Sequence, residues 1–158
     1  MRALSVRPPW WWAILHLGKD IENRSWPTKF RGRILLHASK WWVFRHICDD
    51  LDFIEQIAPN SMKLDFATKH PHTFLKSFGG CIMGSVEIVD CVTVSPSPWF
   101  TGPYGLVLRH PIAFTVPVAY KGALGLFKVN ESCIPSAELL NLQANGQEDR
   151  AMPVSIQI

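Results

Sequence analysis

Among the four ionisable side chains of residues 18–26, Lys19, Glu22 and Arg24 are of types and at a spacing that could do chemistry. Lys19 sits at a predicted junction between a helix and a strand, and Glu22 and Arg24 project from one face of that strand. A lysine at a partly desolvated site loses its proton more easily, so Lys19 could act as a base or nucleophile beside Glu22. A salt-bridge ladder on the surface is the alternative, and these residues alone favour neither.

Cations and tryptophans are concentrated near the start of the chain. The 158 residues carry a net charge of +3, yet residues 1–46 hold nine Lys and Arg against two Asp and Glu, which gives +7. Six of the seven tryptophans lie in residues 1–42. Such a segment suits nucleic acid, because cations meet phosphates and aromatic rings stack on unpaired bases. Composition alone nevertheless favours the alternative, in which the tryptophans fill a core beneath a solvated rim of charge.

The elements that must position these residues follow from periodicity and turn residues. Two helices are predicted, at 10–17 and 40–57, with Ser39 as the N-cap of the second. The strands alternate between apolar and polar residues or are apolar throughout, and they are predicted at 3–6, 20–24, 31–38, 81–94, 104–109 and 112–118. Strands that follow helices without regular alternation indicate an α+β fold. A small β-barrel of about six strands with flanking helices is the simplest closure.

Two further segments are harder to place. Residues 58–80 are polar and irregular, which indicates an insertion or a mobile lid. The tail carries a short candidate helix at 136–142 and a candidate strand at 154–158.

Several classes of protein are excluded. The length suits a single domain, and without an apolar run of about eighteen residues we expect no membrane span. The apolar run at 10–17 starts too late for a signal peptide, so we expect a cytoplasmic protein. The four cysteines form no CxxC pair and are interpreted as mostly buried thiols.

The sequence also lacks the motifs of several cofactor-dependent and catalytic sites. It has no phosphate-cradling glycine loop, no GxSxG elbow and no zinc-deaminase signature. The pairs His70-x-His72 and His46-x-Cys48 could chelate a metal, but short pairs of this kind occur often by chance. We therefore expect neither a metal nor a cofactor.

Ordered sequence blocks spread over residues 3–129 resemble the ASCH domain family, a PUA-like group. The blocks are Leu4-Ser5-Val6-x-Pro-Pro-Trp10, Gly18-Lys19-x-x-Glu22-x-Arg24-x-Trp26, residues 31–39, Gly80-x-Ile82-x-Gly84-x-Val86-x-x-x-Asp90-Cys91, residues 102–105 and residues 121–127. Several blocks in the same order as in the family make the resemblance more specific than a single block would. It predicts an ASCH domain over residues 1–130 and a C-terminal extension over 131–158 that packs on the domain or on a partner.

The resemblance implies a PUA-like barrel with a cleft for RNA or nucleotides. The segment around Lys19 would line that cleft. With the cations and aromatic residues found above, the candidate nucleic-acid-binding residues are Trp10, Lys19, Arg24, Trp26, Arg31, Arg33, Ser39, Lys40 and Trp99. The expected partner is RNA, single-stranded nucleic acid or a nucleoside, bound by a monomer or weak dimer. Trp12, Trp42 and His37 are instead expected in the core.

Two alternatives come with the resemblance. Small bacterial members resemble an amidohydrolase that deacetylates acetylated cytidine with a Lys, a Thr and a Glu, and other members are ribonucleases. Lys19 matches that lysine, Glu22 stands at the position of the threonine, and Glu87 is a candidate for the third residue. Lys19 and Glu22 are therefore the candidate catalytic residues of a hydrolase. A protein-interaction domain, with Trp11 or Trp41 exposed in an interface, is the other alternative.

Overall fold

The computed structural model describes residues 1–40, 44–59 and 78–148. Six strands form one sheet in the order β2-β5-β4-β3-β1-β6. The strands are β1 (Arg2–Val6), β2 (Ile21–Arg24), β3 (Gly32–Ala38), β4 (Cys81–Val92), β5 (Tyr104–Ala119) and β6 (Leu126–Lys128). The helices are α1 (Trp10–His16), α2 (Phe44–Ile57) and α5 (Ser136–Glu148), and a 3-10 turn, η2, covers Glu131–Cys133.

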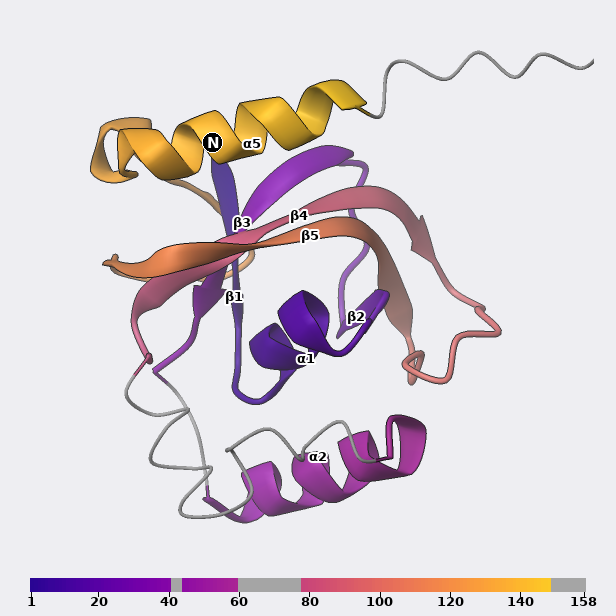
Figure 1. Cartoon of the computed structure of the whole chain (residues 1–158). Coiled ribbons are helices and arrows are strands. Elements are labelled where there is room, and N and C mark those ends of the chain that lie inside the picture. The colour runs from indigo at the N-terminus through magenta and orange to yellow at the C-terminus, as the bar shows by residue number, and fades with distance from the viewer. Residues whose placement is uncertain (41–43, 60–77, 149–158) are drawn as a thin grey trace, which may run out of the picture.

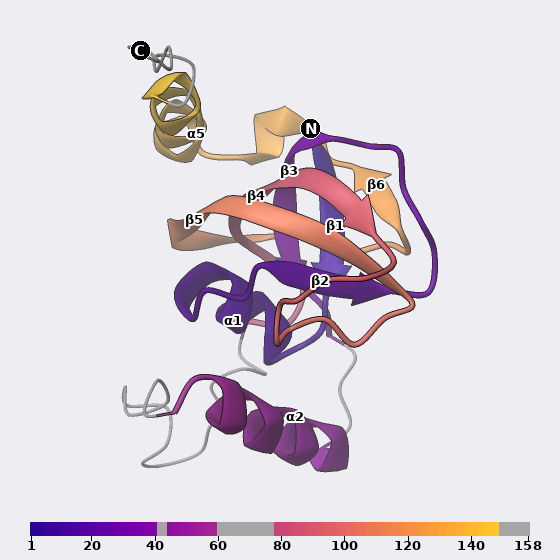
Figure 2. The same ribbon diagram turned by 90° about the vertical axis from the view of Figure 1, so that its right-hand side faces the viewer.

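The sheet is a curled half-barrel, which confirms the predicted α+β, PUA-like fold (Figures 1 and 2). Strands β1 and β3 pair in parallel, and the other neighbours are antiparallel. The register of β4 against β5 shifts at three places between Ile82 and Asp90. Because each irregularity bends a strand and increases its twist, the two longest strands can curl around α1.

The two faces of the sheet are covered by different helices (Figure 1). Alternate side chains of β3 pack on opposite faces of the sheet, as expected for a strand. Leu36 packs with Trp11 of α1 on one side, and Leu35 packs with Leu142 of α5 on the other. All residues from Ile34 to Ala38 are buried, because β3 lies inside the sheet between β4 and β1. The boundary predicted at residue 130 stays a prediction, although α5 packs on the sheet.

Several expectations about the elements are wrong. Residues 104–119 form one strand: His110, with a positive φ of 52°, lies at a register shift between the pairs Glu87–Arg109 and Ser85–Ile112, and the pairing with β4 resumes beyond it. The N-cap role of Ser39 stays a prediction, because residues 41–43 lie outside the described residues; the Ser39 amide donates to the Val6 carbonyl. The short strand β6 carries too few residues for a periodic signal and was not predicted.

The cysteines and Trp11 also differ from expectation. Cys48 and Cys133 are exposed, and Cys81 and Cys91 are only half-buried, so these free thiols are not mostly core residues. Trp11 is 1% exposed and belongs to the core, which removes it from the interaction-domain alternative. Trp12 is partly buried against the same core.

Some predictions concern parts of the chain outside the described residues. They are those on Trp41, Trp42, the His70-x-His72 pair, most of the segment 58–80 and the strand at 154–158. Among the described residues, no helix is long and apolar enough to cross a membrane. The cytoplasmic location and the monomeric or weakly dimeric state stay predictions.

His37 is a hydrogen-bonded core histidine that joins three parts of the fold. It is 2% exposed on β3. Its Nδ1 lies 3.1 Å from the Ser5 hydroxyl of β1, and its Nε2 lies 3.0 Å from the carbonyl oxygen of Tyr120. A carbonyl only accepts, so Nε2 is the donor. Burial lowers the pKa of His37 below its usual value, the bond to Tyr120 opposes this, and the charge of Lys40 adds to the lowering.

We predict that the stability of the protein falls with acidification through His37. Because the pKa of His37 is lowered in the folded protein, the unfolded chain binds a proton below about pH 6.5 that the folded chain does not bind. The free energy of unfolding therefore decreases as the pH drops. The measurement is the Tm at about pH 7.5 and about pH 5.5 for the wild type and His37→Gln. The variant should lose less stability on acidification. His46→Gln, which changes an exposed histidine of α2, is the control. An identical pH dependence in His37→Gln and the wild type would contradict this role.

Candidate functional site

The end of α1 fixes the position of Lys19. Gly18 takes a positive φ of 69°, a conformation that costs glycine little. The next amide, that of Lys19, folds back to donate to the Ala13 carbonyl at 3.1 Å. Lys19 therefore stands directly at the end of the helix, and β2 begins two residues later.

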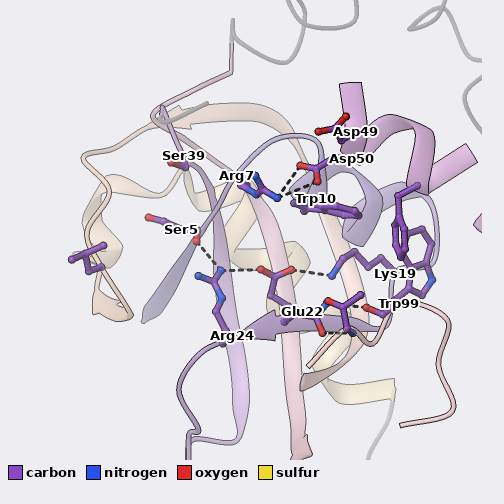
Figure 3. A pocket seen from close by; sticks show the side chains of 14 residues that line it. Ser5, Arg7, Trp10, Lys19, Glu22, Arg24, Ser39, Asp49, Asp50 and Trp99 are labelled. Carbon is purple, nitrogen blue, oxygen red and sulfur yellow. Dashed lines mark hydrogen bonds and ion pairs between the residues drawn. The ribbon is translucent and has the colours of Figure 1, made fainter. Parts of the chain in front are cut away.

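A chain of alternating charges starts at Lys19 (Figure 3). Lys19 Nζ donates to the Ile21 carbonyl and to Glu22 Oε2, the latter at 2.9 Å. The other carboxylate oxygen of Glu22 lies 3.0 Å from Arg24 Nη2, which also donates to the Ser5 carbonyl at 2.8 Å. The side chains of Lys19, Glu22 and Arg24 are only 2%, 10% and 20% exposed. We call these three residues the charge network.

Burial decides against the surface ladder considered from the sequence. Removing each charged group from water costs several kcal/mol, and the attraction between the partners roughly offsets this cost. A buried network of this kind therefore adds little net stability compared with apolar side chains of the same size. A role in stability therefore does not explain why three charged residues are buried here. Their position in the lining of a cavity suggests a role in binding instead.

The charge network forms part of the lining of a cavity of about 650 Å³, within the range typical of small-molecule sites. Three aromatic side chains, from α1, α2 and the loop after β4, share this lining. The described lining residues are Ser5, Arg7, Trp10, Lys19, Glu22, Asn23, Arg24, Ser39, Asp49, Asp50, Phe53, Trp99, Thr101 and Leu124. We call this space the tryptophan cavity.

Trp10 and Trp99 are held in place by specific contacts. Lys19 Nζ lies 5.5 Å from the centre of the Trp10 ring, and Phe53 meets that ring edge to face at 5.9 Å. Asn23 of β2 donates to the Trp99 carbonyl at 2.8 Å, and its side-chain oxygen accepts from the Thr101 amide at 2.9 Å. The loop that carries Trp99 is thus fastened to the strand that carries Glu22.

Helix α2 adds acidic groups that the sequence pattern did not assign to the site. Asp49 and Asp50 line the cavity, and Asp50 Oδ2 lies 3.0 Å from Arg7 Nη2. Burial raises the pKa of the Asp50 carboxyl, and the Arg7 charge opposes that rise. Among the described lining residues, three cations meet three carboxylates, so the cavity is aromatic but not cationic.

The structure brings together only part of the predicted set. Trp10, Lys19, Glu22, Arg24, Ser39 and Trp99 line the tryptophan cavity. Of the others, Trp26 packs on the core, Arg31 pairs with Asp90 at 2.7 Å on the surface, and Arg33 donates to Ser85 and to the His110 carbonyl. Lys40 lines a neighbouring cavity.

Some lining residues outside the predicted set lie inside the quoted sequence blocks: Ser5 and Arg7 in the first, and Asn23 in the second. Asn23 stands between Glu22 and Arg24, so its position was a usable signal. Asp49, Asp50 and Phe53 come to the site only because α2 packs beside α1, and no local pattern shows this.

Glu87, the candidate for a third catalytic residue, does not join the site. Glu87 lies 3.1 Å from His110 Nδ1 on the exposed part of β4 and is not among the described lining residues of the tryptophan cavity. In the part of the chain that the structure describes, no three His, Cys, Asp or Glu side chains gather as a metal site requires.

We predict that Glu22→Gln destabilises the protein strongly. The change leaves Lys19 and Arg24 buried without a carboxylate, and breaking a buried ion pair in this way costs about 3–5 kcal/mol. Chemical denaturation of the wild type and the variant measures it. Asp90→Asn is the matched control, because it makes the same kind of change in the exposed Arg31 pair and should leave stability nearly unchanged. Equal effects of the two substitutions would show that burial does not distinguish the pairs.

Comparison with known proteins identifies the family. The ASCH domain family matches residues 4–103, which include α1, the charge network and β4. The human protein "Activating signal cointegrator 1" is 23% identical over 135 residues, an alignment that covers 80% of this chain and 22% of that protein. The chain therefore spans only about a fifth of the length of this relative. The family match over most of the chain agrees with the curled sheet and with the ordered motifs, and this chain belongs to the ASCH domain family.

Proposed function

We propose that this protein binds RNA or single-stranded nucleic acid, or a nucleoside, by taking one unpaired base into the tryptophan cavity. The observation that carries the proposal is that Trp10 and Trp99 line the same cavity as the buried charge network. Membership of the ASCH domain family supports nucleic-acid binding as the class of function.

The properties of the cavity fit a base better than a phosphate. A base is a flat, uncharged ring with donors and acceptors at its edge, and it stacks on aromatic side chains with about 1–3 kcal/mol per base. A phosphate in the same place would meet the carboxylates of Glu22, Asp49 and Asp50. The ammonium group of Lys19 has three donors, and the Ile21 carbonyl and Glu22 take two of them. The third is the donor we assign to the base edge.

A site inside a cavity also selects unpaired bases. A base inside a duplex is stacked and cannot enter a cavity unless it is first turned out of the helix, which costs a few kcal/mol. The bases of single strands, loops and free nucleosides are unpaired, so the free-energy cost of turning them out of a helix is smaller or absent. The proposed ligand is therefore single-stranded.

Trp10→Leu is predicted to weaken binding of nucleosides and short single-stranded oligonucleotides by roughly 5- to 150-fold, the equivalent of one lost stacking contact. Calorimetric titration with the four ribonucleosides and with short RNA and DNA strands measures the change. Circular dichroism of the variant verifies that the fold is kept.

Trp26→Leu is the matched control for this experiment. Trp26 is also partly buried and also packs on the core, but it is not among the described lining residues. Its replacement should leave affinity nearly unchanged. Equal weakening by both substitutions, or wild-type protein that binds none of the probes at low ionic strength, would exclude the tryptophan cavity as the base site.

A hydrolase is the second candidate, because Lys19 and Glu22 lie 2.9 Å apart and buried at the cavity. We expect binding without turnover, since both oxygens of Glu22 are already in ion pairs and a carboxylate stands where a hydroxyl nucleophile would be needed. Chromatography of acetylated cytidine and of single-stranded RNA after incubation tests this, with and without divalent metal. Product that disappears in a folded Lys19→Met variant would establish the hydrolase instead.

A further inference from the structure

A second and larger cavity adjoins the tryptophan cavity. Its volume is about 1060 Å³, and it shares Ser5, Ser39 and Leu124 with the first. The shared residues come from β1, the end of β3 and the loop before β6, so the two spaces meet along one rim. Leu124 is 99% exposed on this rim. A ligand that fills the tryptophan cavity and extends past the rim enters the second space.

The charge of the second cavity is opposite in character to that of the first. Lys40 and Lys121 line it, and its described lining includes no Asp or Glu. Both lysines are exposed, and among the described residues neither forms a salt bridge with an Asp or Glu. We call this space the lysine cavity. Its uncompensated positive charge suits an anion.

The fold restricts the position of the Lys40 side chain. The stem of Lys40 lies across Gly80, where an added Cβ would come within 2.2 Å of Lys40 Cε. The Lys40 charge is also close enough to His37 to contribute to the lowering of its pKa. The stem of this lysine is therefore packed against the fold.

The loop that carries Lys121 is fastened as well. The carbonyl of Tyr120 accepts from His37 at 3.0 Å, and the Ser5 hydroxyl oxygen lies 3.1 Å from the Ala123 carbonyl oxygen. Gly122 lies so close to His37 that an added Cβ would be 2.4 Å from its ring. A site whose loop is held before the ligand arrives loses less conformational entropy on binding.

We propose that the lysine cavity binds the phosphate group attached to the base that occupies the tryptophan cavity. The shared chemistry is a phosphate ester, which a free nucleotide or the backbone of a single strand can supply. This inference rests on the proposed function, because the base determines which phosphate reaches Lys40 and Lys121. One cavity then recognises the base and the other provides affinity for the charged backbone.

The test compares ligands that differ only in phosphate, using the full chain. Probes are a nucleoside, its 5′- and 3′-monophosphates, a trinucleotide and inorganic phosphate. We expect one of the monophosphates to bind roughly tenfold or more tightly than the nucleoside, because a charge-assisted contact is added. The double variant Lys40→Gln/Lys121→Gln should lose this gain and keep the affinity for the nucleoside. A trinucleotide that binds more tightly than either monophosphate would identify the backbone of a strand as the source.

Salt dependence gives a second readout. The slope of log K against log salt for the trinucleotide should fall by about 1 for each lysine removed. The control is Lys29→Gln/Lys128→Gln, which removes two exposed lysines that line neither cavity among the described residues. It should leave both the phosphate gain and the slope as in the wild type.

The outcomes separate this inference from the proposed function. Equal affinity for nucleoside and both monophosphates, or a phosphate gain that survives in the double variant, would overturn the phosphate site while base binding stands. Phosphate that binds in a lysine-dependent way to a protein that binds no nucleoside would leave the phosphate site and overturn the base site. Failure of every probe would overturn both.

Discussion

The structure depends first on the burial of Glu22 between two cations. This carboxylate neutralises Lys19 at the end of α1 and Arg24 at the end of β2, and Arg24 in turn reaches the Ser5 carbonyl of β1. Three elements are therefore joined at one point that contributes to the cavity lining. Each of the two cations would be costly to bury alone, so the geometry of the ends of α1, β1 and β2 is tied to a single acidic side chain.

The aromatic part of the site is built on the same residues. Trp10 lies over Lys19, and Asn23, which is next to Glu22 in the chain, fastens the loop of Trp99. The four-residue strand β2 thus supplies the acid, one cation and the anchor of a ring. Precise placement of polar groups on a strand, with aromatic side chains brought to them, is a common way to build a site that fixes both the position and the orientation of a flat ligand.

Much of this could be predicted from the sequence, and the failures have physical reasons. The alternation in β3 and the apolar spacing in α1 report local geometry, so the central strand and the first helix were predictable. The positions of Lys19, Glu22 and Arg24 were predictable because they lie within one short segment. The contribution of Asp49, Asp50 and Phe53 was not, because it arises from the packing of α2 beside α1. The break predicted between residues 109 and 112 was wrong, because β5 accommodates the positive φ of His110 at a register shift and pairs with β4 again at Ile112.

The charge asymmetry of the sequence has a different meaning once the chain is folded. Cations of the N-terminal segment form salt bridges with acids of the same segment and of later elements. Lys19 and Arg24 pair with Glu22, Arg7 pairs with Asp50, and Arg31 pairs with Asp90. The tryptophan cavity is therefore neutral, although the segment that supplies much of its lining carries an excess of +7. The positive charge beside it comes from Lys40, at the end of the basic segment, and from Lys121, which composition places in the acidic remainder. Because electrostatic attraction to a polyanion depends on cations that no acid neutralises, position in the fold rather than the count along the chain decides where a backbone can bind.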